Sequence, residues 1–354
     1  MMNKKILIHC STNSGTSNFG DVIFAEMILN HLQDAGYEAG FFELSDYVDD
    51  YLYKTKKFER HIISMDSADG VVYFAGGYFG EKKSERIDRS IRHYKRFMRF
   101  GKLALNANKP IAVIGIGAGP YLWFPSKSIV KKVCNCASVI STRDPESTSY
   151  LKGIGVSNQI ETCSDLAQTY LLPNDYTSNN SLFNDNCDYI FLHTNYQIDV
   201  ATLFANGVKD LVLNNPNIKV IVGADNVVNI DNAAEIVKRI LGDNRVVVYN
   251  YSIPDDLCAV ISKCDLIITY KLHVGILAST LGRSVISVYK HPKIVRYYNQ
   301  IKQIERCVDF NKCSVNTLSN LVNSFYGKTF NIPIDVLNSS KRNWDLLDAF
   351  VSSL

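Results

Sequence analysis

The chain alternates between short apolar runs and amphipathic stretches for most of its length. The apolar runs have the length of buried strands, and in the stretches between them apolar residues recur every three or four positions, as on one face of a helix. We expect strands at residues 5–10, 38–44, 70–74, 110–114, 138–140, 189–193, 219–223, 245–249, 265–269 and 284–289. We expect helices at residues 22–35, 82–102, 145–151, 201–214, 233–241, 254–263, 273–281 and 315–326. Regular alternation of strand and helix predicts an α/β fold with parallel sheets.

A polar segment divides this alternation into two halves. Residues 173–186 are rich in Asn, Ser and Asp and have the composition of a linker. A chain of 354 residues can form two domains of roughly 150 residues each. We therefore expect an N-terminal domain at 1–172, a C-terminal domain at 187–335, and a tail at 336–354. Where two such αβ domains face each other, the tail often crosses back to the first domain.

The composition narrows the class of protein. Hydrophobic residues make up 46% of the chain and the net charge is +3, which is ordinary for a globular protein and too small to indicate nucleic-acid binding. No apolar run approaches the roughly 20 residues of a membrane span, and the stretch at 6–8 is too short for a signal peptide. Nine irregularly spaced cysteines argue against a disulfide framework and a zinc site. We expect a cytoplasmic protein.

The stretch 264–293 combines a βαβ pattern with a group of cations. Its helix ends before Gly282, a residue suited to the left-handed position that follows many helices. Ligands of open α/β sheets bind outside the carboxyl ends of the strands. Both strands here are followed by basic residues, namely Lys271 and His273 after the first and Lys290, His291 and Lys293 after the second. The pattern predicts an anion site.

Glycine-bearing loops follow several predicted strands of the first half. Gly15 and Gly20 have the spacing of a P-loop, but Asp21 and Val22 stand where Lys and Ser or Thr are required, so we reject an NTPase. The run at 115–120 lacks the third glycine of a dinucleotide fingerprint, so no nicotinamide or flavin cofactor is indicated. The remaining glycines are better explained by backbone that passes close to a ligand or to the opposing domain, and they are Gly76, Gly77, Gly117 and Gly119.

Taken in order, these elements resemble the polysaccharide pyruvyl transferase family. The C-terminal signature is Lys271-Leu272-His273, followed by Gly282, Tyr289 and Lys293. Earlier similarities are the run 18–21, the Gly76-Gly77 pair, the run 115–120, Arg143-Asp144 with Ser147, and the run 164–167. The family has Arg where this chain has Lys271, and lysine keeps the charge but lacks the bidentate fork of arginine.

The resemblance implies both a fold and a reaction. The fold would be GT-B-like, α/β with two Rossmann-like domains facing across a cleft, the first for the acceptor and the second for phosphoenolpyruvate. The reaction would move pyruvate from phosphoenolpyruvate to two hydroxyls of a sugar as a cyclic ketal, in bacterial surface or capsular polysaccharide biosynthesis. The acceptor would be a sugar, for example a galactose-containing one on a lipid diphosphate. Phosphoenolpyruvate would be the donor substrate, and we expect no cofactor and no metal.

The resemblance also implies roles for individual residues. His273 would protonate the methylene carbon of the donor, because that carbon must gain a proton before C2 becomes electrophilic. Arg143 suits bidentate capture of carboxylate or phosphate, and Lys271 and Lys293 suit charge neutralisation. The backbone amides around Leu272 could hold an oxyanion at the helix N-terminus.

Structural explanations stand beside these roles. His273 could be a histidine packed at the end of a strand, and Arg143 could brace a helix through an ion pair. Asp21 would orient or deprotonate the acceptor hydroxyl, but it also sits where a helix N-cap belongs. Asp144 is expected to cap the helix that begins at Pro145.

Two further functions stay open on the sequence alone. A GT-B nucleotide-sugar glycosyltransferase shares the fold, although such enzymes usually carry an acidic residue for the ribose near the C-terminal strand ends, where this chain is basic. A family member that binds anions without catalysis is the other alternative, suggested by Lys271.

An arginine-rich helix is expected at 82–102. On a helical wheel Ile87, Ile91, Tyr94 and Met98 share one face, which we expect to pack on the first domain. The opposite face carries Arg89, Arg92, Arg96 and Arg99. This stripe is either a solvated face or a contact for anionic lipid headgroups or the diphosphate of a lipid-linked acceptor. The second interpretation places the protein at the cytoplasmic face of the inner membrane.

Overall fold

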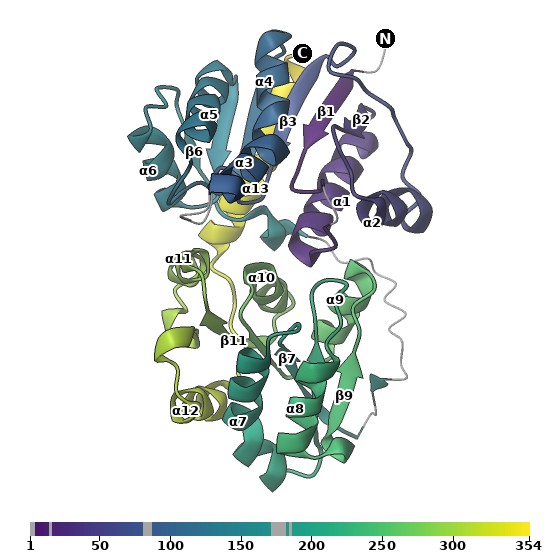
Figure 1. Cartoon of the computed structure of the whole chain (residues 1–354), viewed down its shortest axis with the longest axis vertical. Coiled ribbons are helices and arrows are strands. Elements are labelled where there is room, and N and C mark those ends of the chain that lie inside the picture. Colours follow the sequence, from purple (N-terminus) through teal and green to yellow (C-terminus); the bar gives the residue numbers. More distant parts are fainter. Residues whose placement is uncertain (1–3, 14–15, 81–86, 171–181, 184–185) are drawn as a thin grey trace. The chain divides into compact units, whose positions relative to one another are not determined.

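The computed structural model describes residues 4–13, 16–80, 87–170, 182–183 and 186–354 (Figure 1). The chain forms two compact units. Unit 1 comprises Met1–Thr169 and Asp335–Leu354, and unit 2 comprises Tyr170–Ile334. Most of the linker expected at 173–186 lies outside the described residues.

Unit 1 is built on a parallel sheet. Its described strands are β1 (Lys5–His9), β2 (Glu38–Phe41), β3 (Gly70–Phe74), β4 (Ile111–Ile116), β5 (Val139–Thr142) and β6 (Glu161–Thr162). Their order is β2-β1-β3-β4-β5-β6, and all neighbours are parallel. The chain leaves β1 for β2 on one side and continues through β3 on the other, so the topological switch point lies between β1 and β3. β3 and β4 are fully buried, which explains their unbroken apolar sequences.

Helices cover both faces of this sheet. They are α1 (Phe19–Asp34), α2 (Asp46–Asp50), α3 (Ile87–His93), α4 (Arg99–Asn106), α5 (Phe124–Cys136), α6 (Pro145–Gly153) and α13 (Ile334–Ser352). On one face α4 and α5 lie side by side (Figure 1), and Phe100 and Val133 pack with the strand residues Tyr73 and Val113. On the other face the Phe74 ring lies between α1 and α13, with its centroid 6.4 Å from that of Phe24 and 5.3 Å from that of Trp344.

The structure corrects the expected helix at 82–102. Residues 82–86 lie outside the described part, and the remainder is α3, a π-helical turn at Tyr94–Met98, and α4. A π turn holds more residues than an α turn, so the two helical segments are out of phase and one wheel cannot describe both. The predicted apolar face is therefore wrong: Met98 is buried, but Ile87 and Ile91 are 62% and 38% exposed.

The two helix caps expected in unit 1 have different outcomes. Asp144 is confirmed as the cap of α6, because its carboxylate accepts a hydrogen bond from the Ser147 amide at 2.7 Å. Asp21 is not a cap, since α1 begins earlier than expected and Asn18 takes the N-cap position. Asp21 lies in the first turn, where a carboxylate interacts favourably with the helix dipole.

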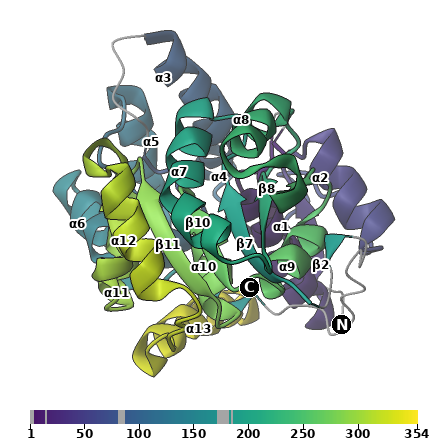
Figure 2. The same cartoon turned by 90° about the horizontal axis from the view of Figure 1, so that it is seen from below.

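Unit 2 repeats the architecture. Its described strands are β7 (Asp188–His193), β8 (Ile218–Gly223), β9 (Val246–Tyr249), β10 (Leu266–Thr269), β11 (Ser284–Tyr289) and β12 (Cys307–Asp309), all parallel in the order β12-β11-β10-β7-β8-β9. Its longer helices are α7 (Ile198–Asn214), α8 (Asp231–Leu241), α9 (Pro254–Ser262), α10 (Leu272–Thr280), α11 (Pro292–Gln300) and α12 (Val315–Phe325). Helices α12, α7 and α8 lie side by side over one sheet face (Figure 2), where they complete a core with Leu192, Val222 and Ile268.

The C-terminal helix packs on unit 1. Asn343 is fully buried; its side-chain oxygen accepts a hydrogen bond from the Ser141 hydroxyl at 2.7 Å, and its amide donates to the Ser164 carbonyl at 3.1 Å. The Trp344 indole donates to the Thr169 hydroxyl at 2.9 Å. These partners follow or belong to β5 and β6, so α13 is an integral part of the first unit. Of the helices that the structure describes, none is long and apolar enough to cross a membrane.

Candidate active site

The carboxyl edge of the unit 2 sheet has one topological switch point. The chain passes from β7 to β8 and β9 on one side, and then to β10, β11 and β12 on the other. The switch point therefore lies between β7 and β10, which are hydrogen-bonded neighbours. Loops diverge from such a point and leave a crevice where ligands of doubly wound sheets bind.

The Lys271-Leu272-His273 run stands at this switch point. β10 ends at Thr269, and Lys271 is the N-cap residue of α10. The Lys271 amide donates to the Thr269 hydroxyl at 3.0 Å, which fixes the corner between strand and helix. The Lys271 side chain does not cap α10, and the first amides of a helix have no intrahelical acceptor. Leu272 is buried and His273 is half-buried in the first turn.

The far end of α10 agrees with the sequence. The helix ends at Thr280, Leu281 is its C-cap, and Gly282 has φ +64°, the left-handed conformation expected for it.

A buried polar cluster lies beside the Lys271 corner, and the sequence analysis did not find it. His193 ends β7, Asn195 follows it, and Asp225 follows β8; their side chains are at most 3% exposed. Asn195 Nδ2 donates to Asp225 Oδ1 at 2.9 Å, and the Asp225 amide donates to Asn195 Oδ1 at 3.0 Å. The His193 ring contacts Asp225 Oδ1 through Nε2 at 3.4 Å and the Thr269 hydroxyl through Nδ1 at 3.0 Å.

The charge on Asp225 is held by its neighbours. Burial alone raises the pKa of this carboxyl, but the Lys271 ammonium, the His193 ring and the Asn195 amide together outweigh burial and hold the pKa well below its usual range. The Lys271 Nζ atom lies 3.8 Å from Asp225 Oδ1. The Asp225 carboxylate thus gives Lys271, whose side chain is otherwise flexible, a fixed partner at the switch point.

The basic residues after β11 have different surroundings. Lys290 Nζ forms an ion pair with Asp199 Oδ2 at 2.7 Å and lies 4.0 Å from the centroid of the Phe310 ring. His291 caps α11 by accepting a hydrogen bond from the Lys293 amide at 3.3 Å. Lys293 itself is half-buried in the first turn of α11. Because β11 neighbours β10, Lys293 and Lys271 follow adjacent strands on the same edge.

In unit 1, Arg143 lies among the predicted glycines. It follows β5, is 6% exposed, and forms ion pairs with Asp165 at 3.4 Å and Asp144 at 3.8 Å. A side chain on Gly117 would begin 2.6 Å from Arg143 Nε, and one on Gly77 would begin 3.4 Å from Nη2, so the guanidinium lies flat against glycine backbone. The bracing ion pair considered from the sequence is therefore present, and glycine at positions 77 and 117 leaves room for the guanidinium.

The other two glycines shape the same loops. Gly76 has φ +80°, and its carbonyl accepts a hydrogen bond from the Gly117 amide at 2.8 Å, which joins the loops after β3 and β4. Gly119 has φ +68°, and its amide donates to the Phe79 carbonyl at 3.0 Å. Both positions favour glycine, because other residues rarely adopt a positive φ.

Asp21 and Arg96 border the unit 1 switch point. The Thr16 hydroxyl lies 3.4 Å from Asp21 Oδ2. Arg96 is half-buried: Nε donates to Asn13 Oδ1 at 2.9 Å, and Nη2 donates to the carbonyls of Asn13 and Ser11 at 2.8 and 3.4 Å. Arg96 therefore holds the loop after β1, and its predicted place in a solvent-exposed arginine stripe is wrong.

The chain's similarity to known proteins can now be set beside this geometry. A sequence model of the family described as polysaccharide pyruvyl transferase matches residues 18–292. The chain belongs to this family. The match contains the unit 2 switch point, and it includes Asp21, Arg143 and the Lys271-Leu272-His273 run. No curated protein sequence is similar enough to match.

Solved structures add information on the fold. The chain is similar to MnaA of S. aureus, solved with UDP, with a TM-score of 0.67 and 12% identity over 100% of this chain and 98% of that chain. It is also similar to a putative UDP-N-acetylglucosamine 2-epimerase from Listeria monocytogenes, with a TM-score of 0.69 and 10% identity over 100% and 98% of the two chains. HepE of Anabaena in complex with UDP and glucose gives a TM-score of 0.54 at 11% identity over 98% and 100%. At these identities the similarity concerns the fold, and the GT-B-like α/β class predicted for this pyruvyl transferase family member is confirmed.

The predicted site residues of this family member form two sets. Asp21, Gly76, Gly77, Gly117, Gly119 and Arg143 lie at the carboxyl edge of the unit 1 sheet, where hydrogen bonds and close contacts join the four strand-end loops. Lys271, Leu272, His273 and Lys293 lie at the carboxyl edge of the unit 2 sheet. Of the predicted stripe, Arg89, Arg92 and Arg99 are exposed.

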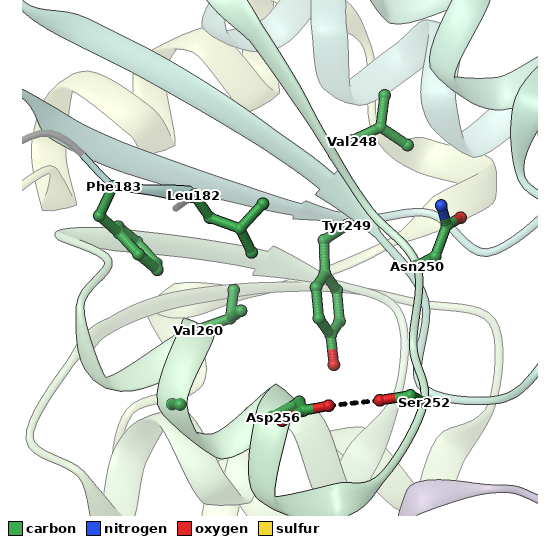
Figure 3. Close-up of a pocket in the computed structure, with 9 residues that line it drawn as sticks. Leu182, Phe183, Val248, Tyr249, Asn250, Ser252, Asp256 and Val260 are labelled. Atoms are coloured by element: carbon green, nitrogen blue, oxygen red, sulfur yellow. Dashed lines mark hydrogen bonds between the residues drawn. The ribbon is translucent and has the colours of Figure 1, made fainter. Parts of the chain in front are cut away.

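A cavity of about 190 Å³ in unit 2 lies beside β9, outside these sets. Figure 3 shows it between β9 and α9, with the Tyr249 ring and the Asp256 carboxyl directed into the same space and the Ser252 hydroxyl bonded to Asp256. Its nine lining residues are Leu182, Phe183, Val248, Tyr249, Asn250, Ser252, Asp256, Ala259 and Val260. Asp256 is the one charged residue among these nine, so the cavity would repel a small anion.

The missed residues carried a usable signal. His193 is the last residue of an apolar strand, and Asn195 and Asp225 follow apolar strands closely, as Lys271 does. Polar residues at carboxyl strand ends are site candidates in any doubly wound sheet. The sequence does not show that β7 pairs with β10, and this pairing brings the three polar residues close to Lys271.

Proposed function

We propose that this chain is a pyruvyltransferase that moves pyruvate from phosphoenolpyruvate to two hydroxyls of a sugar as a cyclic ketal, in the biosynthesis of a bacterial surface polysaccharide. One observation carries the proposal: the family's Lys271-Leu272-His273 signature stands at the N-terminus of α10, at the switch point of unit 2. A helix N-terminus beside a lysine favours an anion such as phosphate or carboxylate.

The chemistry requires an acid, cations and two acceptor hydroxyls. His273 donates a proton to the methylene carbon of phosphoenolpyruvate, and C2 becomes electrophilic. One hydroxyl adds to C2 and loses its proton, and phosphate leaves with the electrons of its C–O bond. The second hydroxyl then adds to C2 and loses its proton. The products are the ketal and inorganic phosphate; one of the two released protons restores His273 and the other is taken up by the leaving phosphate.

Unit 2 is assigned the donor. Lys271 and Lys293 neutralise the phosphate and carboxylate charges, and the first amides of α10, beginning at Leu272, hold an oxygen of the donor. Asp225 is a positioning residue, because it holds the Lys271 ammonium at 3.8 Å without facing the donor itself. The fixed position of the Lys271 ammonium compensates in part for the forked arginine that the family has and this chain lacks.

Unit 1 is assigned the sugar. Asp21 orients or deprotonates the acceptor hydroxyl from the first turn of α1. Arg143 keeps a fixed fork, because Asp165 and Asp144 hold it against Gly117, and a guanidinium so placed suits a carboxylate or phosphate of the substrate. The glycine loops allow a ligand to approach backbone closely.

The setting of the reaction is part of the proposal. All nine cysteines are free thiols, which suits a reducing cytoplasm. Phosphoenolpyruvate is the donor substrate and no cofactor is needed for the steps above. The acceptor is proposed to be a galactose-containing sugar on a lipid diphosphate.

The test is incubation of the protein with phosphoenolpyruvate and a panel of galactosyl and N-acetylmannosaminyl acceptors, followed by mass spectrometry and phosphate release. We expect a product heavier by one pyruvate less one water, together with one phosphate per product. The His273→Ala variant is the matched negative control.

Other outcomes select the alternatives. Thermal stabilisation by nucleotide sugars but not by phosphoenolpyruvate would favour a glycosyltransferase. Stabilisation by phosphoenolpyruvate with no product from any acceptor would favour a member that binds the anion without catalysis.

A further inference from the structure

Unit 1 exposes a group of large apolar side chains on α3 and at the start of α5. Ile87 and Ile91 of α3 are 62% and 38% exposed, and Phe124 of α5 is 77% exposed. The two elements adjoin: the rings of Tyr94 and Trp123 meet edge to face with centroids 6.4 Å apart, and Figure 2 shows α3 at the periphery of the unit. We call Ile87, Ile91, Trp123 and Phe124 the α3–α5 surface.

Cations are interleaved with this apolar group. Arg89, Arg92 and Lys95 are exposed on the same short segment, and Asp88, which pairs with Arg92 at 3.0 Å, is the single carboxylate of residues 87–95. The segment therefore carries three cations against one anion. Exposed isoleucine and aromatic rings among basic side chains are typical of helices that lie in the interface of an anionic membrane.

The π turn creates this arrangement. It rotates Met98 and Arg96 toward unit 1, where Arg96 holds the loop after β1, and Arg99 forms an ion pair with Glu43 at 3.1 Å. Ile87 and Ile91 precede the π turn and lie on the side of the helix away from Met98, so they face solvent. The solvent-exposed face of this segment therefore carries both apolar and basic side chains, whereas the stripe expected from the sequence was basic alone.

We propose that the α3–α5 surface docks on anionic lipid headgroups, with Ile87, Ile91 and Phe124 entering the interface and Arg89, Arg92 and Lys95 binding lipid phosphates. Charge complementarity selects a lipid surface as the occupant. A second copy of this chain would bring the same three cations against each other in a symmetric contact.

The position of the surface agrees with the acceptor role of unit 1. Trp123 lies four residues beyond Gly119 in the loop after β4, and Arg96 lies one turn beyond Arg92. A lipid-held acceptor would therefore reach the unit at the loops assigned to the sugar. This last step rests on the proposed function, whereas membrane docking itself does not.

Sedimentation of the full chain with vesicles tests the proposal. We expect binding to vesicles of equimolar phosphatidylglycerol and phosphatidylcholine at low salt, and much weaker binding to pure phosphatidylcholine. The Arg89→Gln/Arg92→Gln/Lys95→Gln variant should bind about 10²-fold more weakly at low salt, an effect that fades as salt is raised. The Ile87→Ser/Ile91→Ser/Phe124→Ser variant should bind about tenfold more weakly at every salt concentration.

Ile62 supplies the matched control, because it is 95% exposed elsewhere on the same unit. Ile62→Ser should bind as the wild type does, and circular dichroism melts should show that all variants are folded. Wild type that ignores the anionic vesicles, or an Ile62→Ser variant that loses as much binding as the triple serine variant, would overturn the proposal. So would light scattering that finds a dimer lost in the triple serine variant. No donor or acceptor enters this test, so its failure would leave the proposed function standing.

Discussion

Acid should destabilise unit 1 through a single buried histidine, His9. The residue ends β1, is 2% exposed, and Nε2 has no hydrogen-bond partner among the described residues. Aromatic rings surround it: the Phe100 ring stacks on it at 5.1 Å, and the others are Phe42, Tyr73, Tyr78 and Phe97. Burial first, and then the nearby Arg96 charge, lower its pKa to about 3.

Proton linkage gives the direction and the magnitude of the change in stability. Below its usual pKa of about 6.5 the His9 ring binds a proton in the unfolded chain, whereas in the folded chain the ring stays neutral down to about pH 3. Stability is therefore complete above pH 6.5 and falls as the pH drops through this window. At pH 5 the loss is about 2 kcal/mol, and at pH 3 it is about 4 kcal/mol.

The His9→Phe variant isolates this effect. Phenylalanine fits an aromatic cage and cannot bind a proton, so the variant should lose about 2 kcal/mol less than the wild type between pH 8 and pH 5. At pH 8 the variant can be more or less stable than the wild type, because the phenylalanine ring is larger. The comparison therefore uses the change in unfolding free energy between pH 8 and pH 5 for each protein. Both tryptophans, Trp123 and Trp344, belong to unit 1, so urea unfolding followed by tryptophan fluorescence reports on this unit.

Phe24→Leu is the control, since it changes another buried aromatic side chain of unit 1 without removing an ionisable group. That variant should keep the acid sensitivity of the wild type. Equal losses of unfolding free energy in wild type and His9→Phe between pH 8 and pH 5 would refute the reasoning.

Three further predictions concern the two strand edges. His273→Ala should lower turnover by about 10²-fold or more while calorimetry still detects phosphoenolpyruvate binding; near-normal turnover would remove His273 from the chemistry. Arg143→Lys should raise the KM for a diphosphate-linked sugar acceptor about tenfold, because the charge stays and the fork is lost, and an unchanged KM would place the acceptor's diphosphate elsewhere. Asp225→Asn should destabilise unit 2 by about 2 kcal/mol at neutral pH, as it leaves Lys271 without its carboxylate. Hydrogen exchange of the β7 and β8 amides measures this loss. Because folding lowers the pKa of Asp225, the stabilities of wild type and variant should converge as the pH falls below about 4.

The strands of unit 2 were readable from the sequence because the sheet is buried on both faces. The expected strand at 284–289 coincides with β11, and that at 265–269 differs from β10 by one residue. A parallel sheet covered by helices needs unbroken apolar strands. The edge strands β6 and β12 were missed, since two or three residues carry no pattern that distinguishes a strand from a loop.

The part of the candidate site that could be predicted from the sequence is formed by residues adjacent in the chain. Lys271, Leu272 and His273 adjoin one another, and their place at a strand end follows from the βαβ pattern. Asp225 and His193 come from other strands, and their relation to Lys271 depends on which strands pair. The phase of the arginine helix failed for a different reason: a π turn changes the helical period, and hydrophobic periodicity assumes that the period is constant.

The return of α13 makes unit 1 discontinuous in sequence, which affects the order in which the chain can fold. Unit 2 is a continuous segment and can close its core as soon as it has left the ribosome. Unit 1 is synthesised first, but the sheet face that carries Phe74 lacks Trp344 and Asn343 until α13 emerges. The nascent first unit therefore exposes an apolar sheet face during the synthesis of some 160 residues. Chaperone binding to this protein should concentrate on unit 1, and truncation before α13 should lead to aggregation of unit 1 while leaving unit 2 folded.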